Sequence, residues 1–233
     1  MARDATRRQR VATEPGALAR PCGPDLQFER EAWEAGRVVV AGVDEVGRGA
    51  LAGPVVAAAV VLDPARVPEG LDDSKKLTAK RREELSRVIR ETALCFHVAR
   101  VESDEIDRVN ILQATLQAMR VALEALAPCA DFVLVDGNVR VPGWPGEQRT
   151  LVGGDAASVS IAAASIVAKV ERDRIMAEMD LVWPGYDFTA NAGYGTSFHR
   201  AALERLGPCP VHRHSFRGVA PRDLFSALPA ETD

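Results

Sequence analysis

The sequence has few cysteines and no recognisable secretory signal. The first residues, MARDATRRQR, are not followed by the apolar segment of a secretory signal. There are four cysteines, far apart and without CxxC spacing: Cys22, Cys95, Cys129 and Cys209. We therefore expect a reduced, cytoplasmic protein. Cys209, His212 and His214 form a CxxHxH group, but a structural zinc site needs four ligands and no fourth is apparent nearby, so zinc is the less favoured interpretation.

Long apolar runs and an excess of positive charge are also missing. The longest apolar run covers residues 50–62 and contains Gly53 and Pro54, so it is too short and too broken for a transmembrane helix. The 29 Lys and Arg against 33 Asp and Glu give a net charge of −4, which excludes a histone-like protein that binds nucleic acid by bulk charge. We expect no membrane partner, and any polyanion must be bound by a local basic patch.

The apolar content is sufficient for a full core. Of the 233 residues, 47% are hydrophobic and 27% charged, as in globular domains. Residues 1–36 mix arginines with prolines and glycines, which predicts a flexible N-terminal extension. Its basic tip either contacts nucleic acid or is simply solvated. Residues 37–183 form the expected core, and residues 184–233 a C-terminal helical segment packed on it.

Apolar periodicity divides the core into strands and helices. Runs rich in β-branched residues predict strands at 38–43, 55–62, 94–101 and 132–135, with a short one at 151–152. Helices are expected at 79–92, at 106–126 as one amphipathic helix, and at 161–170 as an interior helix that is apolar nearly all round. This order predicts an α/β fold with a mixed five-stranded sheet flanked by helices.

Acidic residues follow several of these strands. Each is flanked by glycine, which leaves room for a ligand: Asp44 and Glu45, Asp136, and Asp155. Taken singly, such a residue is usually a turn or helix-cap residue. Two carboxylates about 4 Å apart repel by roughly 4 kcal/mol at an effective dielectric near 20, so four that converge would need shifted pKa values or bound cations. Two Mg²⁺ or Mn²⁺ ions suit such oxygen ligands, and a pair of such ions is typical of phosphodiester hydrolysis. The pattern therefore predicts nuclease chemistry.

The adjacent positions of Asp44 and Glu45 present a geometric difficulty. Neighbouring residues on a regular strand point to opposite faces, so both can reach one metal pair only if the strand ends or kinks there. The glycines at positions 47 and 49 are compatible with such a break.

Two further segments are candidates for substrate contacts. The glycine-rich loop at 47–53 lacks the spacing of a dinucleotide-binding loop. The backbone of Gly47, Arg48 and Gly49 could hydrogen-bond a ribose 2′-hydroxyl, although a strained turn is the alternative. The basic run at 75–82 includes Lys75 and Lys76 and either binds phosphates or is a solvated helix face.

One cation lies within the predicted interior helix. Lys169 belongs to the apolar segment at 161–170. An unpaired ammonium there would be costly, so Lys169 needs a carboxylate or phosphate partner.

Six segments carry a resemblance to a known family. They are GVDEVGRG (42–49), DSKKL (73–77), VLVDGN (133–138), GDAASVSIAAASIVAKVERD (154–173), GYGT (193–196) and HRHSF (212–216). Their order and specificity make the chain resemble ribonuclease HII, the type 2 ribonuclease H, over about residues 38–217.

The resemblance implies a ribonuclease H-like core with a small helical C-terminal appendage. It also implies a monomeric endonuclease that cuts RNA in RNA/DNA hybrids and cuts 5′ to single ribonucleotides in duplex DNA, leaving 3′-hydroxyl and 5′-phosphate ends. The cellular setting would be ribonucleotide excision repair and DNA replication. Asp44, Glu45, Asp136 and Asp155 match the four metal-binding acids. Substrate contacts would come from Gly47, Arg48, Gly49, Lys75, Lys76, Lys169 and Tyr194, with Tyr194 packed against the sugar next to the ribonucleotide.

Two positions depart from the family pattern. Gly153 stands where many members carry Lys, and the usual SFxPV ending reads SFRGV at 215–219. The first change removes one nearby positive charge, and neither removes an acidic ligand. The alternatives are a DNA-strand nuclease or transposase-like enzyme on the same fold, and a catalytically silent nucleic-acid-binding module.

Overall fold

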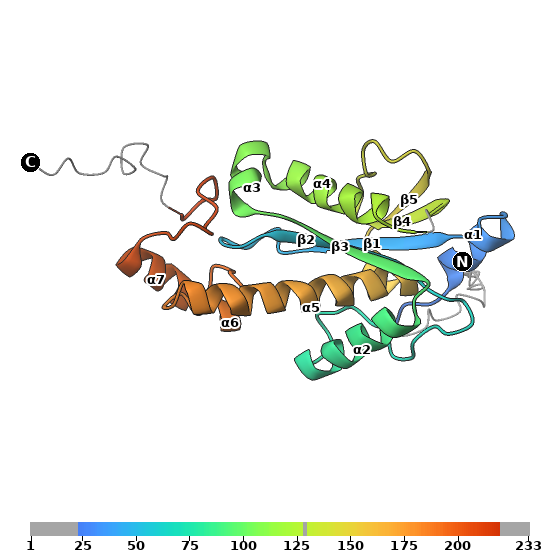
Figure 1. Cartoon of the computed structure of the whole chain (residues 1–233), viewed down its shortest axis with the longest axis horizontal. Helices are drawn as coiled ribbons and strands as arrows, with labels where there is room; N and C mark the ends of the chain where they lie inside the picture. Colours follow the sequence, from blue (N-terminus) through green and yellow to red (C-terminus); the bar gives the residue numbers. More distant parts are fainter. Residues whose placement is uncertain (1–22, 128–129, 220–233) are drawn as a thin grey trace, which may run out of the picture.

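One mixed sheet with helices on both faces forms the centre of the molecule (Figure 1). The computed structural model describes residues 23–127 and 130–219. The strands are β1 (Val40–Val46), β2 (Val55–Val61), β3 (Cys95–Val101), β4 (Phe132–Asp136) and β5 (Glu147–Leu151). The helices are α1 (Gln27–Glu34), α2 (Ala79–Thr92), α3 (Ser103–Val109), α4 (Ile111–Glu124), the short η1 (Gly154–Ala156), α5 (Val159–Val182), α6 (Phe188–Asn191) and α7 (Ser197–Leu206).

The strands are ordered β3-β2-β1-β4-β5. β1, β2 and β3 are antiparallel neighbours, whereas β4 is parallel to β1 and β5 is parallel to β4. The predicted mixed five-stranded sheet is therefore confirmed. The fifth strand is misplaced in the prediction, because Val152 lies beyond the end of β5. The observed β5 has the sequence EQRTL, which is polar and partly exposed, as suits an edge strand. It therefore gives no apolar signal.

Side-chain alternation in β2 separates two apolar layers. Val55, Ala57 and Ala59 belong to the core shared with α4, whereas the alternate residues of β2 pack with α2 and α5. Figure 1 shows α3 and α4 on one face and α2 and α5 on the other. α5 approaches β1 so closely that a Cβ at Gly42 would lie 2.2 Å from the carbonyl carbon of Ser160. This contact fixes α5 beneath the strand that carries the first two acids.

Two predicted helices differ from those observed. The single helix expected at 106–126 is divided into α3 and α4 at Asn110, which has a φ of 72° and accepts hydrogen bonds from the N–H groups of Leu112 and Gln113. The apolar spacing continues across this break, so periodicity alone does not detect it. The helix expected at 161–170 lies within the first half of the 24-residue α5 (Val159–Val182), whose second half carries most of its charged residues.

Part of the expected flexible extension is folded. Residues 27–34 form α1, in which Glu29 and Ala32 are buried. The Glu29 carboxylate accepts hydrogen bonds from the Ser158 hydroxyl and from the Ser160 N–H at the start of α5. The boundary at residue 36 is therefore wrong for this helix, because a buried carboxylate ties it to the core. Residues 1–22 lie outside the described residues.

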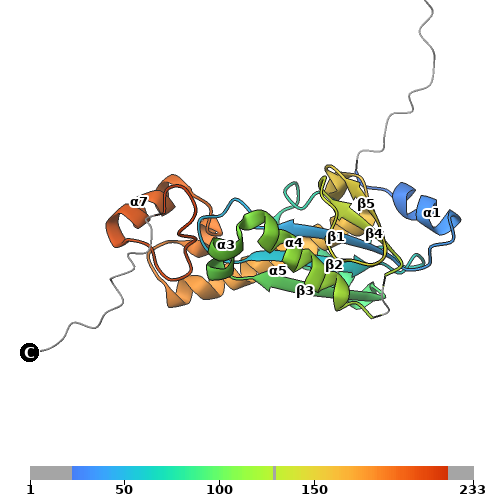
Figure 2. The same cartoon turned by 90° about the horizontal axis from the view of Figure 1, so that it is seen from above.

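Short helices beyond Pro184 are confirmed, and they cover one end of the molecule (Figure 2). α6 and α7 surround a small apolar cluster that includes Tyr186, Phe188 and Leu203. Residues 220–233, the rest of the expected C-terminal segment, lie outside the described residues. Within the described ranges, none of the helices has the length and apolarity needed to cross a membrane.

Candidate active site

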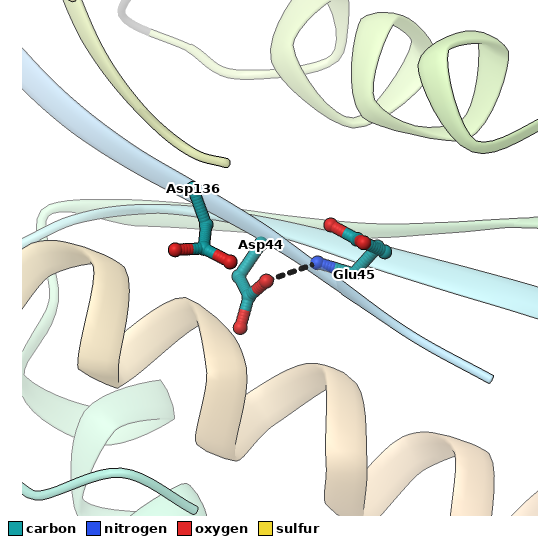
Figure 3. A group of neighbouring side chains, drawn as sticks. All are labelled: Asp44, Glu45 and Asp136. Carbon is teal, nitrogen blue, oxygen red and sulfur yellow. Dashed lines mark hydrogen bonds between the residues drawn. The ribbon is translucent and has the colours of Figure 1, made fainter. Parts of the chain in front are cut away.

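Three of the predicted acids meet where β4 ends beside β1. Each of Asp44, Glu45 and Asp136 offers a carboxylate oxygen, and these oxygens all lie within 4.8 Å of one another (Figure 3). We refer to these three residues as the carboxylate group. It brings together residues from two strands that are far apart in the sequence.

The register of the sheet explains how Asp44 and Glu45 both reach this point. β1 neither ends nor kinks before them, so that expectation is wrong: both residues pair with β2, opposite Ala58 and Ala57. Pairing with β4 stops at Val43. Beyond Val43, the edge of β1 that faces β4 has no neighbouring strand among residues 23–127 and 130–219. The two side chains leave β1 in different directions around that edge (Figure 3).

Burial and mutual repulsion raise the pKa values of the carboxylate group. The pKa of Asp44 is raised well above its usual value, first by burial and then by the charges of Glu45 and Asp136, although hydrogen bonds from Ser165 and the Glu45 N–H oppose the shift. Burial is also the main cause of the raised pKa values of Glu45 and Asp136. A divalent cation would relieve this repulsion, and carboxylate oxygens are the ligands that Mg²⁺ and Mn²⁺ prefer. The residues present therefore fit such a cation.

Asp155 lies next to this group and has a different partner. It belongs to η1, where its carboxylate Oδ2 lies 3.1 Å from the Lys75 Nζ. The charge of Asp155 contributes to the raised pKa of Asp136, and the Gly154 N–H donates to Asp136 at 2.7 Å. Among the described residues, the group with oxygens within 4.8 Å does not include Asp155. Its place as a fourth metal ligand stays a prediction.

A cavity of about 460 Å³ opens over the carboxylate group. Besides those three acids it is lined by Val46, Gly47, Arg48, Gly49, Ser74, Lys75, Ser165, Lys169 and Tyr194. Almost every residue predicted to contact substrate therefore lines one cavity. The exception is Lys76, which is not among the lining residues and whose Nζ lies 3.0 Å from Asp72.

The positively charged side chains that line this cavity are paired with carboxylates. Lys169 pairs with Asp173 one turn further along α5, which confirms the need for a partner that its apolar surroundings predicted. Lys75 pairs with Asp155, and Arg48 lies 3.3 Å from Glu45. These pairs place positive side chains around the carboxylate group.

Two buried arginines without a predicted role support the glycine-rich loop. Arg172 donates to the carbonyls of Ala52, Pro54 and Ala192, and its guanidinium lies 5.6 Å from the centre of the Tyr194 ring. A Cβ at Gly47, where φ is +95°, would lie only 2.1 Å from the Arg172 Nε, so glycine is required there.

Arg213 supports the same loop from a second segment. It donates to the carbonyls of Arg48 and Gly53, and like Arg172 it is fully buried. We refer to Arg172 and Arg213 as the arginine frame. Both occur in segments quoted from the sequence, but nothing in the sequence shows that they meet the loop.

Two serines of the cavity were also missed. The hydroxyls of Ser74 and Ser165 are 2.9 Å apart, and Ser165 hydrogen-bonds Asp44. The pair links the loop before α2 to the carboxylate group through α5. A small polar residue on the helix that faces Asp44 is the only signal that could have identified Ser165.

Two members of the CxxHxH group contact each other. The Sγ of Cys209 lies 3.1 Å from the Nδ1 of His212, and both residues are buried. His214 donates its backbone N–H to Asp107. In residues 23–127 and 130–219, the one set of three or more converging metal-ligating side chains is the carboxylate group.

Comparisons with known proteins agree with this site. The family model described as Ribonuclease HII matches residues 41–219. Ribonuclease HII of Paramagnetospirillum magneticum is 56% identical over 207 residues, which cover 87% of this chain and 100% of that protein. Ribonuclease HII of Geobacter sulfurreducens is 55% identical over 192 residues, covering 82% and 88%.

A solved structure extends the agreement to the fold. The RNase HII in the PCNA complex from Archaeoglobus fulgidus has a TM-score of 0.67 at 26% identity, covering 77% of this chain and 96% of that one. The matched segment contains the carboxylate group, the arginine frame and Tyr194. The chain therefore belongs to the ribonuclease HII family, and it is an endoribonuclease that hydrolyses the RNA of RNA/DNA hybrids.

Proposed function

We propose that this endoribonuclease also cuts duplex DNA on the 5′ side of single embedded ribonucleotides, leaving 3′-hydroxyl and 5′-phosphate ends. One observation carries the proposal. The carboxylate group, the Gly47–Gly49 loop and Tyr194 all line the same cavity, so the scissile phosphate and the sugar beside it would be recognised together.

The proposed metal site consists of Asp44, Glu45 and Asp136, with Asp155 as a fourth ligand released from Lys75. Mg²⁺ or Mn²⁺ would occupy it as a pair of ions. When bound, two such ions stabilise the attacking water and the leaving oxygen of a phosphodiester. The protein contributes a fixed arrangement of ligands, since Asp44 is held by Ser165 and by the Glu45 N–H, and Asp136 by the Gly154 N–H.

Recognition of the ribose is assigned to the loop of Gly47, Arg48 and Gly49. Two of its residues have no side chain, so their backbone groups can approach a 2′-hydroxyl, which is the group that distinguishes RNA from DNA. Tyr194 is 37% exposed and lines the cavity. Its ring is available to pack against the neighbouring deoxyribose, which would report an RNA-to-DNA junction.

Positive side chains would position the backbone of the substrate. Lys75, Lys169 and Arg48 line the cavity, and phosphate contacts from such residues set orientation rather than sequence preference. Lys76, on the same basic run but outside the cavity, would bind a phosphate further along the duplex.

The cellular setting follows from this substrate. We place the enzyme, as a monomer in the cytoplasm, in ribonucleotide excision repair and DNA replication. The scarcity of cysteine and the absence of CxxC spacing support a reducing compartment. An embedded ribonucleotide is a lesion of newly made DNA, which supports the repair role.

A set of three duplexes tests the proposal. One contains a single internal ribonucleotide, one is a continuous RNA/DNA hybrid, and one is all DNA; each is incubated with Mg²⁺, with Mn²⁺ or with chelator. We expect cleavage 5′ to the ribonucleotide and within the hybrid, with either metal and not with chelator. Cleavage of the all-DNA duplex would point instead to a DNA-strand nuclease, and binding without any cleavage to a silent module.

A further inference from the structure

Two histidines outside the active-site cavity are buried and in direct contact. His199 of α7 and His212 are 0% and 1% exposed, and their Nε2 atoms are 3.0 Å apart. Tyr186 and Phe188 enclose the pair, with His212 4.9 Å from the Tyr186 ring centre and His199 5.4 Å from that of Phe188. Water therefore has little access to either imidazole.

Hydrogen bonding defines which nitrogen of each ring carries the proton. The Cys209 N–H donates to the His212 Nδ1 at 2.9 Å, and a backbone N–H can only donate, so this nitrogen is an acceptor without a proton. Its 3.2 Å approach to the Cys209 carbonyl is therefore not a second hydrogen bond. A neutral His212 consequently carries its proton on Nε2, and this proton is donated to the His199 Nε2.

The hydrogen bonds of His199 run in the same donor-to-acceptor direction as those of His212. Because the His199 Nε2 accepts, the proton of a neutral His199 is on Nδ1, which lies 3.0 Å from the Tyr194 carbonyl oxygen. The result is a chain of three hydrogen bonds, from the Cys209 N–H through both imidazoles to Tyr194. We refer to His199 and His212 as the histidine relay. Burial lowers the pKa values of both rings, so both are neutral at pH 7.

The segment at the end of the relay is held in an unfavourable backbone conformation. Ala192 has a φ of 48°, in the left-handed region that residues with a Cβ rarely occupy. The Ala192 carbonyl accepts from Arg172, and the Gly193 carbonyl accepts from the Leu51 N–H. Tyr194 is thus attached to the glycine-rich loop on one side and to the histidine relay on the other.

We propose that His199 is a positioning residue, which sets the position of the Tyr194 ring relative to the Gly47–Gly49 loop and thereby the preference for a ribonucleotide–DNA junction over continuous RNA. His212 fixes the tautomer of His199, so that Nδ1 donates to Tyr194. A side-chain amide in place of His199 needs no such fixing. This inference rests on the role proposed above for Tyr194. The mechanism is the loss of a hydrogen bond. The Tyr194 carbonyl also accepts from the Thr196 N–H at 2.8 Å, so a variant that cannot donate from the place of Nδ1 removes one of its two donors. In a site that excludes water this donor is not replaced, and we expect the strained segment to relax away from the cavity.

Two substitutions at one position separate this role from general packing. In His199→Asn, the side-chain amide can occupy the place of Nδ1 and donate to the Tyr194 carbonyl, but the link to His212 is lost. In His199→Gln, the longer amide can reach the place of Nε2 and accept from His212, but the bond to Tyr194 is lost. Each variant breaks one link of the relay, so both are expected to have a lower Tm.

The measured quantity is the ratio of kcat/KM for the single-ribonucleotide duplex to that for a continuous hybrid. We expect His199→Gln to lower this ratio by about tenfold, the value of roughly one hydrogen bond, and His199→Asn to keep it within about twofold. Mn²⁺ affinity, measured by calorimetry on both variants, should match the unsubstituted protein, since the carboxylate group is untouched. Equal losses of the ratio in both variants would show a packing role only and overturn the proposal.

Tyr194→Ala serves as the reference variant. If it lowers the ratio and His199→Gln does not, the relay is refuted while the proposed function stands. If Tyr194→Ala leaves the ratio unchanged, Tyr194 does not read the junction, and that part of the proposed function fails together with the relay. These two failures are therefore distinguishable.

A measurement on the unsubstituted protein covers the case in which a variant does not fold. Two-bond ¹H–¹⁵N correlation spectra report the tautomer of each histidine. We expect the proton on Nδ1 of His199 and on Nε2 of His212. The opposite tautomer at either ring would refute the relay, because the direction of the chain would no longer end at the Tyr194 carbonyl.

Discussion

The carboxylate group and the arginine frame lie close together, but their buried charges have different kinds of partners. In the carboxylate group, burial and like charges raise the pKa values of all three acids. In the arginine frame, Arg172 and Arg213 donate to backbone carbonyls through all their nitrogens. Burial disfavours charge in both groups, since it also lowers the pKa values of Arg172 and Arg213, and the charge of Arg172 adds to the lowering at Arg213. The guanidinium N–H groups nevertheless have backbone partners, whereas a divalent cation would relieve the repulsion among the three acids. The acids that call for a cation therefore mark the place of chemistry, and the arginines bound to backbone carbonyls mark the structure that positions it.

The largest expected effect comes from removing a member of the carboxylate group. Asp136→Asn should reduce cleavage by about 10³-fold or more, because it removes a metal-ligating charge while the phosphate contacts remain. Turnover and substrate affinity are measured separately, and affinity should change little. Asp63→Asn is the matched control, since Asp63 is a surface acid paired with Arg66. Near-normal turnover of Asp136→Asn would refute the site.

Removing a member of the arginine frame should act on stability. Arg172→Met leaves the carbonyls of Ala52, Pro54 and Ala192 without their donors, so we expect the free energy of unfolding to fall by about 3 kcal/mol. Urea denaturation measures the change. Arg87→Met, at an exposed arginine on α2 that pairs with Glu91, should change it by less than about 0.5 kcal/mol. Equal effects of the two variants would contradict a supporting role for Arg172.

Acid should destabilise the protein through the histidine relay. Burial is the main cause that lowers the pKa of His212 from 6.5 to about 4, and the charges of His199 and His214 lower it further. The unfolded chain binds the proton more readily, so this stability is fully present above pH 6.5 and is lost as the pH falls toward 4.

The size of this effect is about 3 kcal/mol across that pH window. The free energy of unfolding is measured in urea as a function of pH, for the unsubstituted protein and for His212→Gln. The neighbours Cys209 and Tyr186 are kept unchanged in both. The variant should lose this part of the pH dependence. Identical pH profiles would show that His212 does not have a lowered pKa.

The smallest effect should be a gain of stability at the active site. Asp44 has a raised pKa, so its charged form costs stability at neutral pH when no metal is bound. Asp44→Asn should therefore raise the free energy of unfolding in chelator by about 1 kcal/mol, although the variant is inactive. In Mn²⁺ the order should reverse, because only the unsubstituted protein gains stability by binding the ion. A less stable variant in chelator would contradict the repulsion.

Most strands and the acidic character of the site were predictable, whereas several boundaries were not. The apolar runs that form β1, β2 and β4 are dense enough to be recognised locally. β5 was misplaced because EQRTL is an edge strand with a polar sequence, and the break between α3 and α4 was missed because Asn110 acts through its backbone conformation. α1 was missed because its stability comes from Glu29, whose partners are more than a hundred residues away.

The sequence by itself determined the kinds of groups available: acids next to glycines after apolar runs, a loop without side chains, and a basic run, in motifs characteristic of one family. Only the tertiary structure decided which of these meet. Asp44 and Glu45 converge with Asp136 because β4 ends where β1 continues. The loop is held in place because Arg172 and Arg213 donate to its carbonyls from distant segments. Sheet register and long-range hydrogen bonds are properties of the packed chain, so local sequence patterns do not specify them.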